Sequence, residues 1–312
     1  MINFDHNNLS IAVILGGNSA EREVSLRSGA AVIKALEQQN IKVTAIDGVE
    51  QLLKSKPEEC DAVFNILHGE AGENGELAGL LSAMKIKYTG CEVAGAVLSW
   101  NKNVAKILVQ KQGLKVPSSQ LIRHIGELKV TGSGPWIVKP NKEGSSVGLY
   151  YSNNLAELKI NITQALNNVD EILIEDFIKG TECTVAIVNG KVLPVIRIVP
   201  GIGLYDYQAK YESQDTAYYC PSGFDEALEK ALKRDAMTAF EALELKGWAR
   251  IDFIVDETGN RWFLEANTTP GMTETSLVPK AAAAIGWDFN QLVLQILSTA
   301  FENNNAGVDD DV

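Results

Sequence analysis

The sequence predicts a chain of mixed α/β and α+β class. Residues 1–95 alternate apolar strand patterns with helix patterns, which is typical of a doubly wound parallel sheet covered by helices on both faces. After about residue 95, strands come in pairs joined by short polar turns, which indicates antiparallel sheets. With 312 residues the chain is long enough for two or three domains, which we place at residues 1–95, 96–180 and 181–312.

The N-terminal elements follow one another regularly. "IAVILGG" predicts a buried strand entering a glycine turn, residues 25–38 a helix, and "IKVTAID" and "DAVFNILHG" two further strands. "GELAGLLSAMK" predicts a helix that leads to the short strand "KYTG". Ligands of doubly wound sheets bind beyond the carboxyl ends of the strands, where Gly16-Gly17 and His68-Gly69 lie.

The rest of the chain shows a different order of predicted helices and strands. "LSWNKNVAKILVQKQGLKVP" predicts one amphipathic helix ended by Gly113 and Pro117. "PWIVKP" and "EILIEDFI" predict strands, with a helix at "ELKINITQALNN" between them. The remaining strands are joined by turns at Asn189-Gly190 and Thr258-Gly259.

Composition excludes several classes of protein. Apolar residues make up 46% and charged residues 22%, the balance of a soluble globular enzyme. No apolar run is long enough to cross a membrane, and the N-terminus lacks a secretory signal, so we expect a cytoplasmic protein. The four cysteines form no CxxC, which argues against a zinc site or a disulfide framework. The net charge of −12 argues against binding to nucleic acid.

The stretch "RIDFIVDETGNRWFLEAN" predicts a hairpin that gathers oxygen ligands. Folding it at "DETGN" places Asp252 beside Glu265, with Asn267 on the same face as Glu265 and Arg250 on the face of Asp252. Two carboxylates and an amide oxygen suit magnesium bound together with substrate phosphates. An isolated pair of this kind is more often a solvated surface feature, but the three occur together on apolar strands.

The stretch "KPNKEGSSVG" predicts a phosphate site without a Walker A motif, since GxxxxGK[ST] is absent from the chain. Lys139 ends a strand and Lys102 begins a helix, and lysines suit phosphate oxygens. The loop that follows offers backbone N–H groups that could close over the outer phosphates, from Gly144, Ser145, Ser146 and Gly148.

Phosphate-binding lysines beside a glycine-serine loop, with metal ligands on a separate hairpin, form an arrangement that resembles the ATP-grasp enzymes. Within them, the sequence resembles the D-alanine–D-alanine ligase family. The stretches that carry the resemblance run from residue 15 to residue 279; they are "LGGNSAEREVS", "LHGEAGENG", "KPNKEGSSVG", "YDYQAKY", "GWARIDF" and "LEANTTPGMTETSLVP". The resemblance implies a two-lobed ATP-grasp unit behind the N-terminal domain. Two positions depart from the family pattern: Asn101, where many relatives carry an acidic residue, and Asn74 in "HGEAGENG".

The resemblance also implies substrate contacts. Glu21 would hold the ammonium of the first D-alanine, and a carboxylate is the right partner for that cation. Glu21 alone would otherwise be a favourable helix-terminal charge. His68 would approach the first substrate's carboxylate, although a lone histidine is more often structural. Ser276 and Leu277 fall where the family holds the carboxylate of the second D-alanine.

Residues near the reacting atoms follow in the same way. Ser145 and Tyr211 would link two closing loops over the substrates and exclude water. Lys210 would reach the ATP phosphates from the second loop. Arg250 and the backbone N–H of Gly271 would stabilise the tetrahedral oxyanion.

For the nucleotide, Glu175, Phe177 and Ile178 match the strand and hinge that hold the adenine, and Glu182 would bind the ribose. An ordinary edge strand is the simpler interpretation of these residue types alone. The implied cofactors are ATP and two Mg²⁺ ions, with Mn²⁺ as an alternative and a monovalent cation left open. The implied partners are two molecules of D-alanine and a second copy in a homodimer, with neither nucleic acid nor membrane.

The implied reaction passes the γ-phosphoryl group of ATP to the carboxylate of one D-alanine, and the amine of a second then displaces phosphate. No protein nucleophile is needed, which fits the absence of a GxSxG motif. Three alternatives stay open: a related ligase that uses D-lactate, a nicotinamide-dependent oxidoreductase, and a non-catalytic nucleotide sensor. "GGNSAE" lacks the GxGxxG spacing that the oxidoreductase would require.

Overall fold

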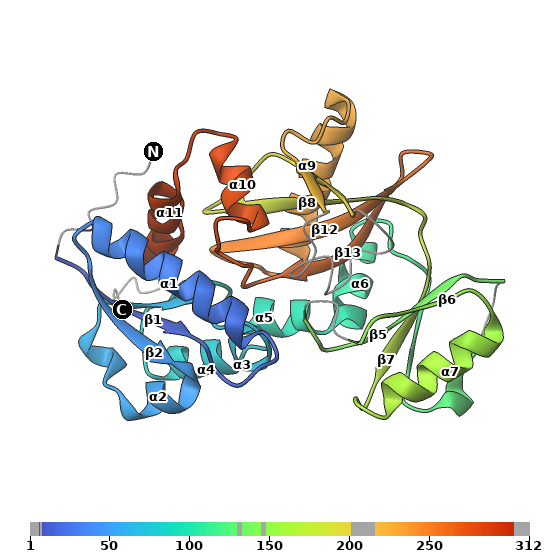
Figure 1. Cartoon of the computed structure of the whole chain (residues 1–312), viewed down its shortest axis with the longest axis horizontal. Helices are drawn as coiled ribbons and strands as arrows, with labels where there is room; N and C mark the ends of the chain where they lie inside the picture. Colours follow the sequence, from blue (N-terminus) through green and yellow to red (C-terminus); the bar gives the residue numbers. More distant parts are fainter. Residues whose placement is uncertain (1–5, 7, 130–132, 145–147, 201–215, 303–312) are drawn as a thin grey trace, which may run out of the picture.

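The structure of the chain is a computed structural model that describes residues 6, 8–129, 133–144, 148–200 and 216–302. These residues form three sheets, arranged along the long axis of the molecule in Figure 1. The N-terminal sheet is parallel, whereas the two sheets that follow are antiparallel. The predicted fold class is therefore confirmed.

The N-terminal sheet has the strand order β2-β1-β3; β1 and β3 are buried, whereas the edge strand β2 is largely exposed. Its elements are β1 (Ser10–Leu15), α1 (Arg22–Gln38), β2 (Lys42–Asp47), α2 (Gly48–Lys54), the 3₁₀ helix η1 (Pro57–Glu59), β3 (Ala62–Asn65), α3 (Glu70–Glu73) and α4 (Glu76–Ala83). Alternate residues of β1 enter different cores. Ile11 and Val13 pack in the core that includes α1, whereas Ala12 and Ile14 pack in the core of α2 and α4. Helices thus cover both faces, as the continuous apolar strand predicts.

The end of the chain returns to this domain. The last two helices are α10 (Leu277–Ala283) and α11 (Phe289–Glu302). Both contribute side chains to the core that contains Ile11, and α11 lies beside α1 (Figure 1). The same core also includes Ala186 and Trp248 of the C-terminal sheet, so α10 and α11 contact both sheets, and the three domain boundaries stay predictions.

Two predicted elements differ from those observed. The strand "KYTG" is reduced to a single bridge between Tyr88 and Val63. The single long helix is instead two helices, α5 (Val93–Trp100) and α6 (Lys102–Lys111). The break occurs at Asn101, whose extended backbone and side-chain oxygen cap α6 by accepting a hydrogen bond from the backbone N–H of Val104 (3.1 Å).

The central sheet has the order β4-β7-β5-β6. Its elements are β4 (Ser119–Ile122), the 3₁₀ helix η2 (Ile125–Glu127), β5 (Trp136–Pro140), β6 (Tyr150–Ser152), α7 (Leu155–Leu166) and β7 (Ile172–Asp176). Val138 and Ile174 pack against α7 on one face. Since side chains alternate along a strand, the neighbouring Lys139 and Glu175 project from the opposite face.

The C-terminal sheet has the order β11-β10-β8-β12-β13, with β9 paired to β8. Its elements are β8 (Gly180–Val188), β9 (Lys191–Val192), β10 (Ile196–Val199), β11 (Ala217–Tyr219), α9 (Glu226–Ala242), β12 (Trp248–Asp256) and β13 (Arg261–Asn267). Phe253 and Phe263 pack in the core that includes α6 and α9. Both predicted turns are present; Asn189 and Gly190 have φ of 49° and 70°, as a tight hairpin turn requires.

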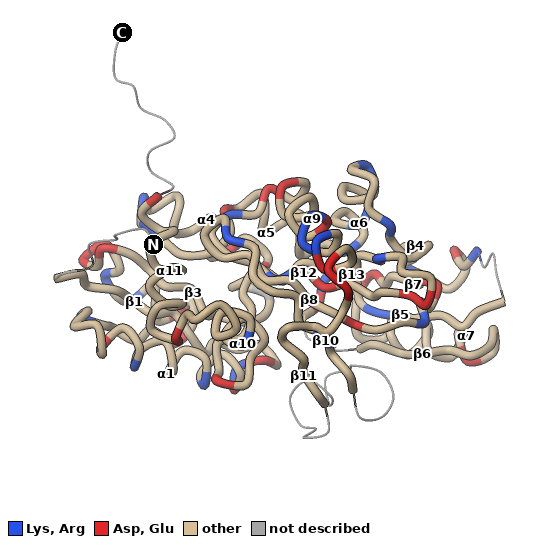
Figure 2. Tube along the Cα trace, turned by 90° about the horizontal axis from the view of Figure 1, so that it is seen from above, with Lys and Arg blue, Asp and Glu red and all other residues tan. Residues whose placement is uncertain are grey.

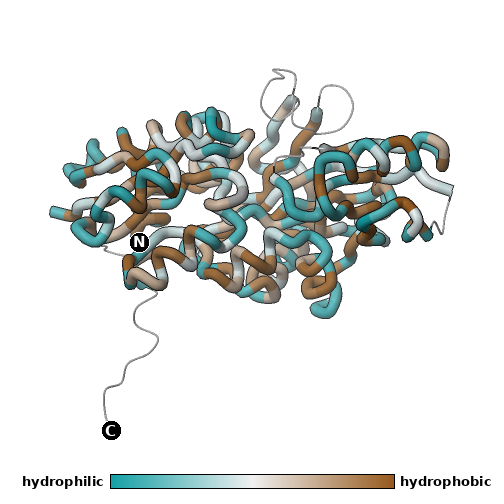
Figure 3. Tube along the Cα trace, turned by 90° about the horizontal axis from the view of Figure 1, so that it is seen from below, coloured by the Kyte–Doolittle hydropathy of each residue, from teal (hydrophilic) through white to brown (hydrophobic). Residues whose placement is uncertain are grey.

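Apolar and polar residues are interspersed along the helices, as Figure 3 shows. No helix in the described part of the chain has the length and apolar character that crossing a bilayer would demand.

Candidate active site

The β12–β13 hairpin brings the predicted oxygen ligands together. Asp252 lies directly opposite Glu265, and Arg250 lies opposite Asn267, with a bulge between Asp252 and Phe253. Asp252 is buried and accepts hydrogen bonds from Arg250 Nε (2.9 Å) and Arg250 Nη2 (2.8 Å). The Thr184 hydroxyl donates a third hydrogen bond at 2.6 Å.

This hairpin offers donors of the kind that a hard cation prefers. Asp252, Glu265 and Asn267 supply carboxylate and amide oxygens on adjacent strands. Among the described residues, no three His, Cys, Asp or Glu side chains gather as a metal-binding group. A hard cation takes six or more oxygen ligands, so these three donors would leave positions for a phosphate-bearing substrate, and the metal assignment stays a proposal.

The first predicted phosphate lysine lies beside the hairpin. Lys102 Nζ is 3.5 Å from Glu265 Oε2 and donates a hydrogen bond to the carbonyl of Glu143. Lys102 is buried, and its backbone N–H bonds the carbonyl of Asn141 at 3.1 Å. The start of α6 is thus joined both to the β12–β13 hairpin and to the loop that follows β5.

The second predicted phosphate lysine shares a carboxylate with Lys106, which is not among the predicted site residues. Lys139 Nζ is 3.0 Å from Glu175 Oε2, and Lys106 Nζ is 3.0 Å from Glu175 Oε1. Only 3% of Glu175 and 2% of Lys106 is exposed. Figure 2 shows basic and acidic residues interspersed where β5, β7, β12 and β13 lie. Lys106 stands four residues after Lys102, and this helical spacing is the only signal for it in the sequence.

The electrostatics of this group follow from burial and from pairing. Burial raises the pKa of Glu175, but Lys106 and Lys139 outweigh it, so that the pKa lies below its usual value. Burial likewise opposes the charge of Lys139, yet Glu175 and Glu265 hold its pKa above the usual value. For Lys106 burial dominates and lowers the pKa to about 8.

Several of the residues predicted to bind the amino-acid substrates lie close together around Gly271 and Gly144. A Cβ added to Gly271 would lie 2.9 Å from Ser276 Oγ and 3.9 Å from His68 Nε2. A Cβ added to Gly144 would lie 2.7 Å from Glu21 Oε2, so the loop after β5 reaches the N-terminal domain. Glu21 and His68 are both buried, at 6% and 3% exposure.

His68 is held by one nitrogen only. Its Nδ1 is 2.8 Å from the carbonyl of Ile66, while the buried Nε2 has no partner among the described residues. Burial lowers the pKa of His68; the nearby Glu21 opposes this and Arg250 adds to it. A neutral ring with one unpartnered buried nitrogen is available to a ligand. Leu277, also predicted here, is buried as the first residue of α10.

Glu73 is a second residue that the sequence does not assign to chemistry, although it lies within "HGEAGENG". It is buried, and burial together with the charge of Glu21 raises its pKa well above the usual value. The backbone N–H of Gly69 points toward its carboxyl group at 3.4 Å. A protonated Glu73 would give this end of the site a hydrogen-bond donor beside Glu21.

The predicted adenine residues border the central sheet. Phe177 follows β7 and makes an edge-to-face contact with Tyr151, with ring centroids 5.1 Å apart. Its backbone N–H bonds the carbonyl of Pro135 at 3.0 Å. Ile178 is the next residue, and Glu182 lies on β8 opposite Ile254. Their contacts with a nucleotide stay predictions.

Three predicted site residues, Ser145, Lys210 and Tyr211, lie outside the described residues. Their roles in closing loops and in phosphate binding stay predictions.

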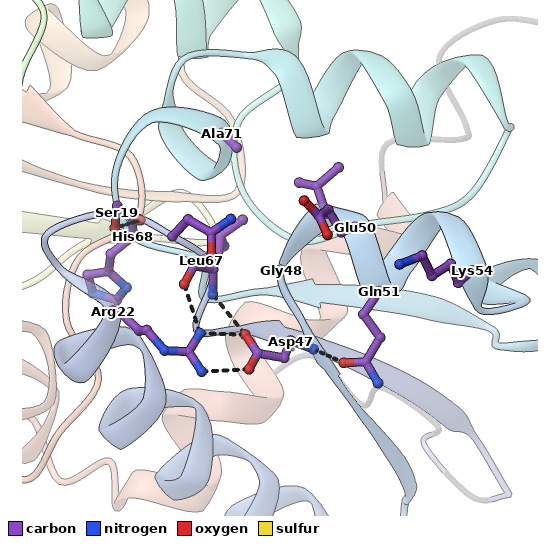
Figure 4. A pocket seen from close by; sticks show the side chains of 13 residues that line it. Ser19, Arg22, Asp47, Gly48, Glu50, Gln51, Lys54, Leu67, His68 and Ala71 are labelled. Atoms are coloured by element: carbon purple, nitrogen blue, oxygen red, sulfur yellow. Dashed lines mark hydrogen bonds and ion pairs between the residues drawn. The ribbon is translucent and has the colours of Figure 1, made fainter.

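A pocket of about 550 Å³ opens beyond the carboxyl ends of β1 and β2, where the glycine turns predict a ligand. Ser19 and His68 line its inner side, so it adjoins the candidate substrate residues (Figure 4). Arg22 and Asp47 form a bidentate ion pair at its edge, in which Nη1 and Nη2 of Arg22 each donate a hydrogen bond of 2.7 Å to a carboxylate oxygen of Asp47. This pair holds the pKa of Asp47 at about 2.

An N-terminal α/β domain followed by two antiparallel sheets that carry lysines and carboxylates defines the ATP-grasp class. Residues 47–91 match the family described as D-ala D-ala ligase N-terminus, and residues 105–298 match D-ala D-ala ligase C-terminus. The chain belongs to the D-alanine–D-alanine ligase family.

Individual relatives agree along nearly the whole chain. A D-alanine–D-alanine ligase of Stutzerimonas stutzeri (strain A1501) is 43% identical over 300 residues, which cover 95% of each protein. The structure of a Bacillus anthracis D-alanine–D-alanine ligase complexed with ATP has a TM-score of 0.83 and 27% identity, covering 94% of this chain and 97% of that one. The VanG D-Ala:D-Ser ligase from Enterococcus faecalis has a TM-score of 0.82 and 28% identity, covering 94% and 100%.

Proposed function

We propose that this chain is an ATP-dependent D-alanine–D-alanine ligase that releases ADP and phosphate and supplies the dipeptide for bacterial cell-wall precursors. One observation carries the proposal: a substrate end with Glu21 and His68 adjoins a phosphate end with Lys102 and the β12–β13 hairpin. The loop after Lys139 connects the two ends, because Gly144 lies against Glu21.

The residues would divide the reaction between them. Glu21 accepts the ammonium of the first D-alanine, and the unpartnered Nε2 of His68 faces the substrate. Lys102 and Lys139 neutralise the phosphates while the carboxylate of D-alanine attacks the γ-phosphorus, and ADP leaves. The amine of the second D-alanine then attacks the resulting acyl phosphate. Arg250 and the Gly271 N–H stabilise the oxyanion before phosphate departs.

The metal site would contribute charge neutralisation. Asp252, Glu265 and Asn267 would hold two Mg²⁺ ions, or Mn²⁺, and metal bound there would offset negative charge on the phosphates. We propose Ser276 and Leu277 as contacts of the second D-alanine. Ser145, Lys210 and Tyr211 would close the site. A cytoplasmic location and a homodimer complete the proposal, and activation by a monovalent cation stays open.

The test is phosphate release from ATP with each amino acid supplied in turn. We expect release with D-alanine and none with L-alanine, since Glu21 and the oxyanion contacts fix two directions about the α-carbon. D-Serine and D-lactate, supplied beside D-alanine, test the second site. Phosphate release that is independent of D-alanine would contradict the proposed function, and a mixed product with D-lactate would favour the related ester-forming ligase.

The role of Glu21 is tested by Glu21→Gln. We expect KM for D-alanine to rise by about tenfold or more, because a charge-assisted contact to the ammonium is lost. ATP affinity, measured by titration, should change much less. If ATP affinity collapses while the D-alanine dependence stays the same, Glu21 does not hold the ammonium.

A further inference from the structure

The lysines around Glu175 differ in what they can reach. Lys139 has a side chain that is 12% exposed, whereas the Lys106 side chain is only 2% exposed. Lys139 is the last residue but one of β5, just before the loop that approaches Glu21, while Lys106 lies within α6. Of the two lysines, Lys139 is the better placed to turn toward a bound nucleotide.

Lys106 joins three elements at one point. Its Nζ contacts Glu175 Oε1 on β7 at 3.0 Å and donates a hydrogen bond to the carbonyl of Phe263 on β13 at 3.3 Å. The Phe263 ring centroid is 6.0 Å away. The contact with Oε1 is ionic rather than a well-directed hydrogen bond. The ammonium is thus fixed from the C-terminal sheet, independently of Lys139.

The buried carboxylate of Glu175 needs a cationic partner also when a nucleotide binds. A buried carboxylate is stable only while it is paired, since removal of its partner leaves an uncompensated charge in a poorly solvated place. If Lys139 leaves Glu175 for the phosphates, Glu175 keeps one partner only because Lys106 is present. Without Lys106, Lys139 would have to stay with Glu175.

We propose that Lys106 is a positioning residue of the ATP site: it holds Glu175 ionised and in place, so that Lys139 is free to bind the nucleotide phosphates. Lys106 touches no substrate. It acts through Glu175, and its loss should weaken nucleotide binding more than it slows the chemical steps. This inference rests on the proposed use of ATP.

The first measurement is titration of the protein with the magnesium complex of a non-hydrolysable β,γ-imido ATP analogue, together with KM and kcat for ATP. For Lys106→Met we expect affinity to fall by about tenfold or more, with a smaller change in kcat. Lys106→Arg keeps the charge and should restore most of the affinity. The matched control is Lys111→Met on the exposed end of the same helix, which should bind like the wild type.

The decisive comparison uses the neutral background Glu175→Gln. There Lys106→Met should change nucleotide affinity by less than about twofold, because no carboxylate is left for Lys106 to hold. An equal loss of affinity in the two backgrounds would mean that Lys106 acts only on the structure and would overturn the inference. So would a folded Lys106→Met variant with wild-type affinity.

Two outcomes need separate interpretation. If Lys106→Met does not fold, the comparison rests on Lys106→Arg, which must keep affinity, and on the double variant, which must match Glu175→Gln. If the wild type binds the analogue but releases no phosphate with D-alanine, the proposed function fails while the test of Lys106 still stands.

Discussion

Replacing Arg250 by methionine should lower the free energy of unfolding by about 3 kcal/mol. Arg250 donates two hydrogen bonds to Asp252, at 2.9 and 2.8 Å, and the two side chains are only 13% and 6% exposed. Removing one partner of a buried ion pair typically costs about 3–5 kcal/mol. The Thr184 hydroxyl would still serve Asp252 at 2.6 Å, so we expect the lower end of that range.

The assay is urea unfolding of the wild type, Arg250→Met and the double variant Arg250→Met/Asp252→Asn. The double variant should recover part of the loss, because an amide needs no cation. Lys179→Met is the matched control: it breaks the exposed ion pair between Lys179 and Glu257, whose side chains are 81% and 73% exposed, and should leave the urea midpoint almost unchanged.

The turnover number kcat tests the Arg250→Met substitution independently of stability. If Arg250 stabilises the oxyanion, Arg250→Met should lower kcat by about 10²–10³-fold. A variant that unfolds within about 0.5 kcal/mol of the wild type would refute the stability argument from the buried pair. A kcat within about tenfold of the wild type would refute the proposed role at the oxyanion.

Three further predictions test other parts of the molecule. Glu265→Gln should keep the fold but lower kcat by about 10²–10³-fold at all magnesium concentrations, and near-wild-type turnover at limiting magnesium would exclude Glu265 as a metal ligand. Gly72→Ala should destabilise the protein by about 3 kcal/mol or more, measured by thermal unfolding, because its Cβ would lie 1.7 Å from the carbonyl oxygen of Leu67. Asp47, with its pKa lowered to about 2 chiefly by Arg22, contributes stability that is present above its usual pKa and is lost as pH falls through about 2. Asp47→Asn should therefore reduce the fall of the urea unfolding midpoint as the pH is lowered from about 5 to 2. A pH dependence identical to that of the wild type would contradict this role of Asp47.

The strands and the β12–β13 hairpin could be predicted because their signals are local. Alternation with period two fixes which residues share a face, and the "DETGN" turn fixes the register that places Asp252 opposite Glu265. The parallel sheet follows equally well from its short apolar strands and intervening helices. These patterns need no knowledge of what lies across the core.

The split between α5 and α6 and the role of Lys106 could not be predicted in this way. Asn101 ends one helix and caps the next, but its amide is also bonded by Asn141, forty residues later in the chain, at 3.0 Å. Lys106 resembles any helical lysine until β7 and β13 are packed against it. Glu73 likewise owes its raised pKa to burial and to Glu21, which only the folded chain brings near.

The pairing of charges in the site explains how an acidic chain can bind a polyphosphate. The net charge of the chain is −12, yet the cluster at the hairpin and the central sheet contains four cations and three carboxylates. These groups are Lys102, Lys106, Lys139 and Arg250, with Asp252, Glu175 and Glu265. Each cation is already held by a carboxylate, so the lysines are ordered before a nucleotide arrives and little side-chain entropy has to be lost on binding. Phosphate oxygens would then exchange places with carboxylate oxygens at Lys102 and Lys139, and the carboxylate released at Glu265 would become available to magnesium. In this scheme the same ion pairs that stabilise the nucleotide-free site set up the metal site, so nucleotide and metal should bind more tightly together than either does alone.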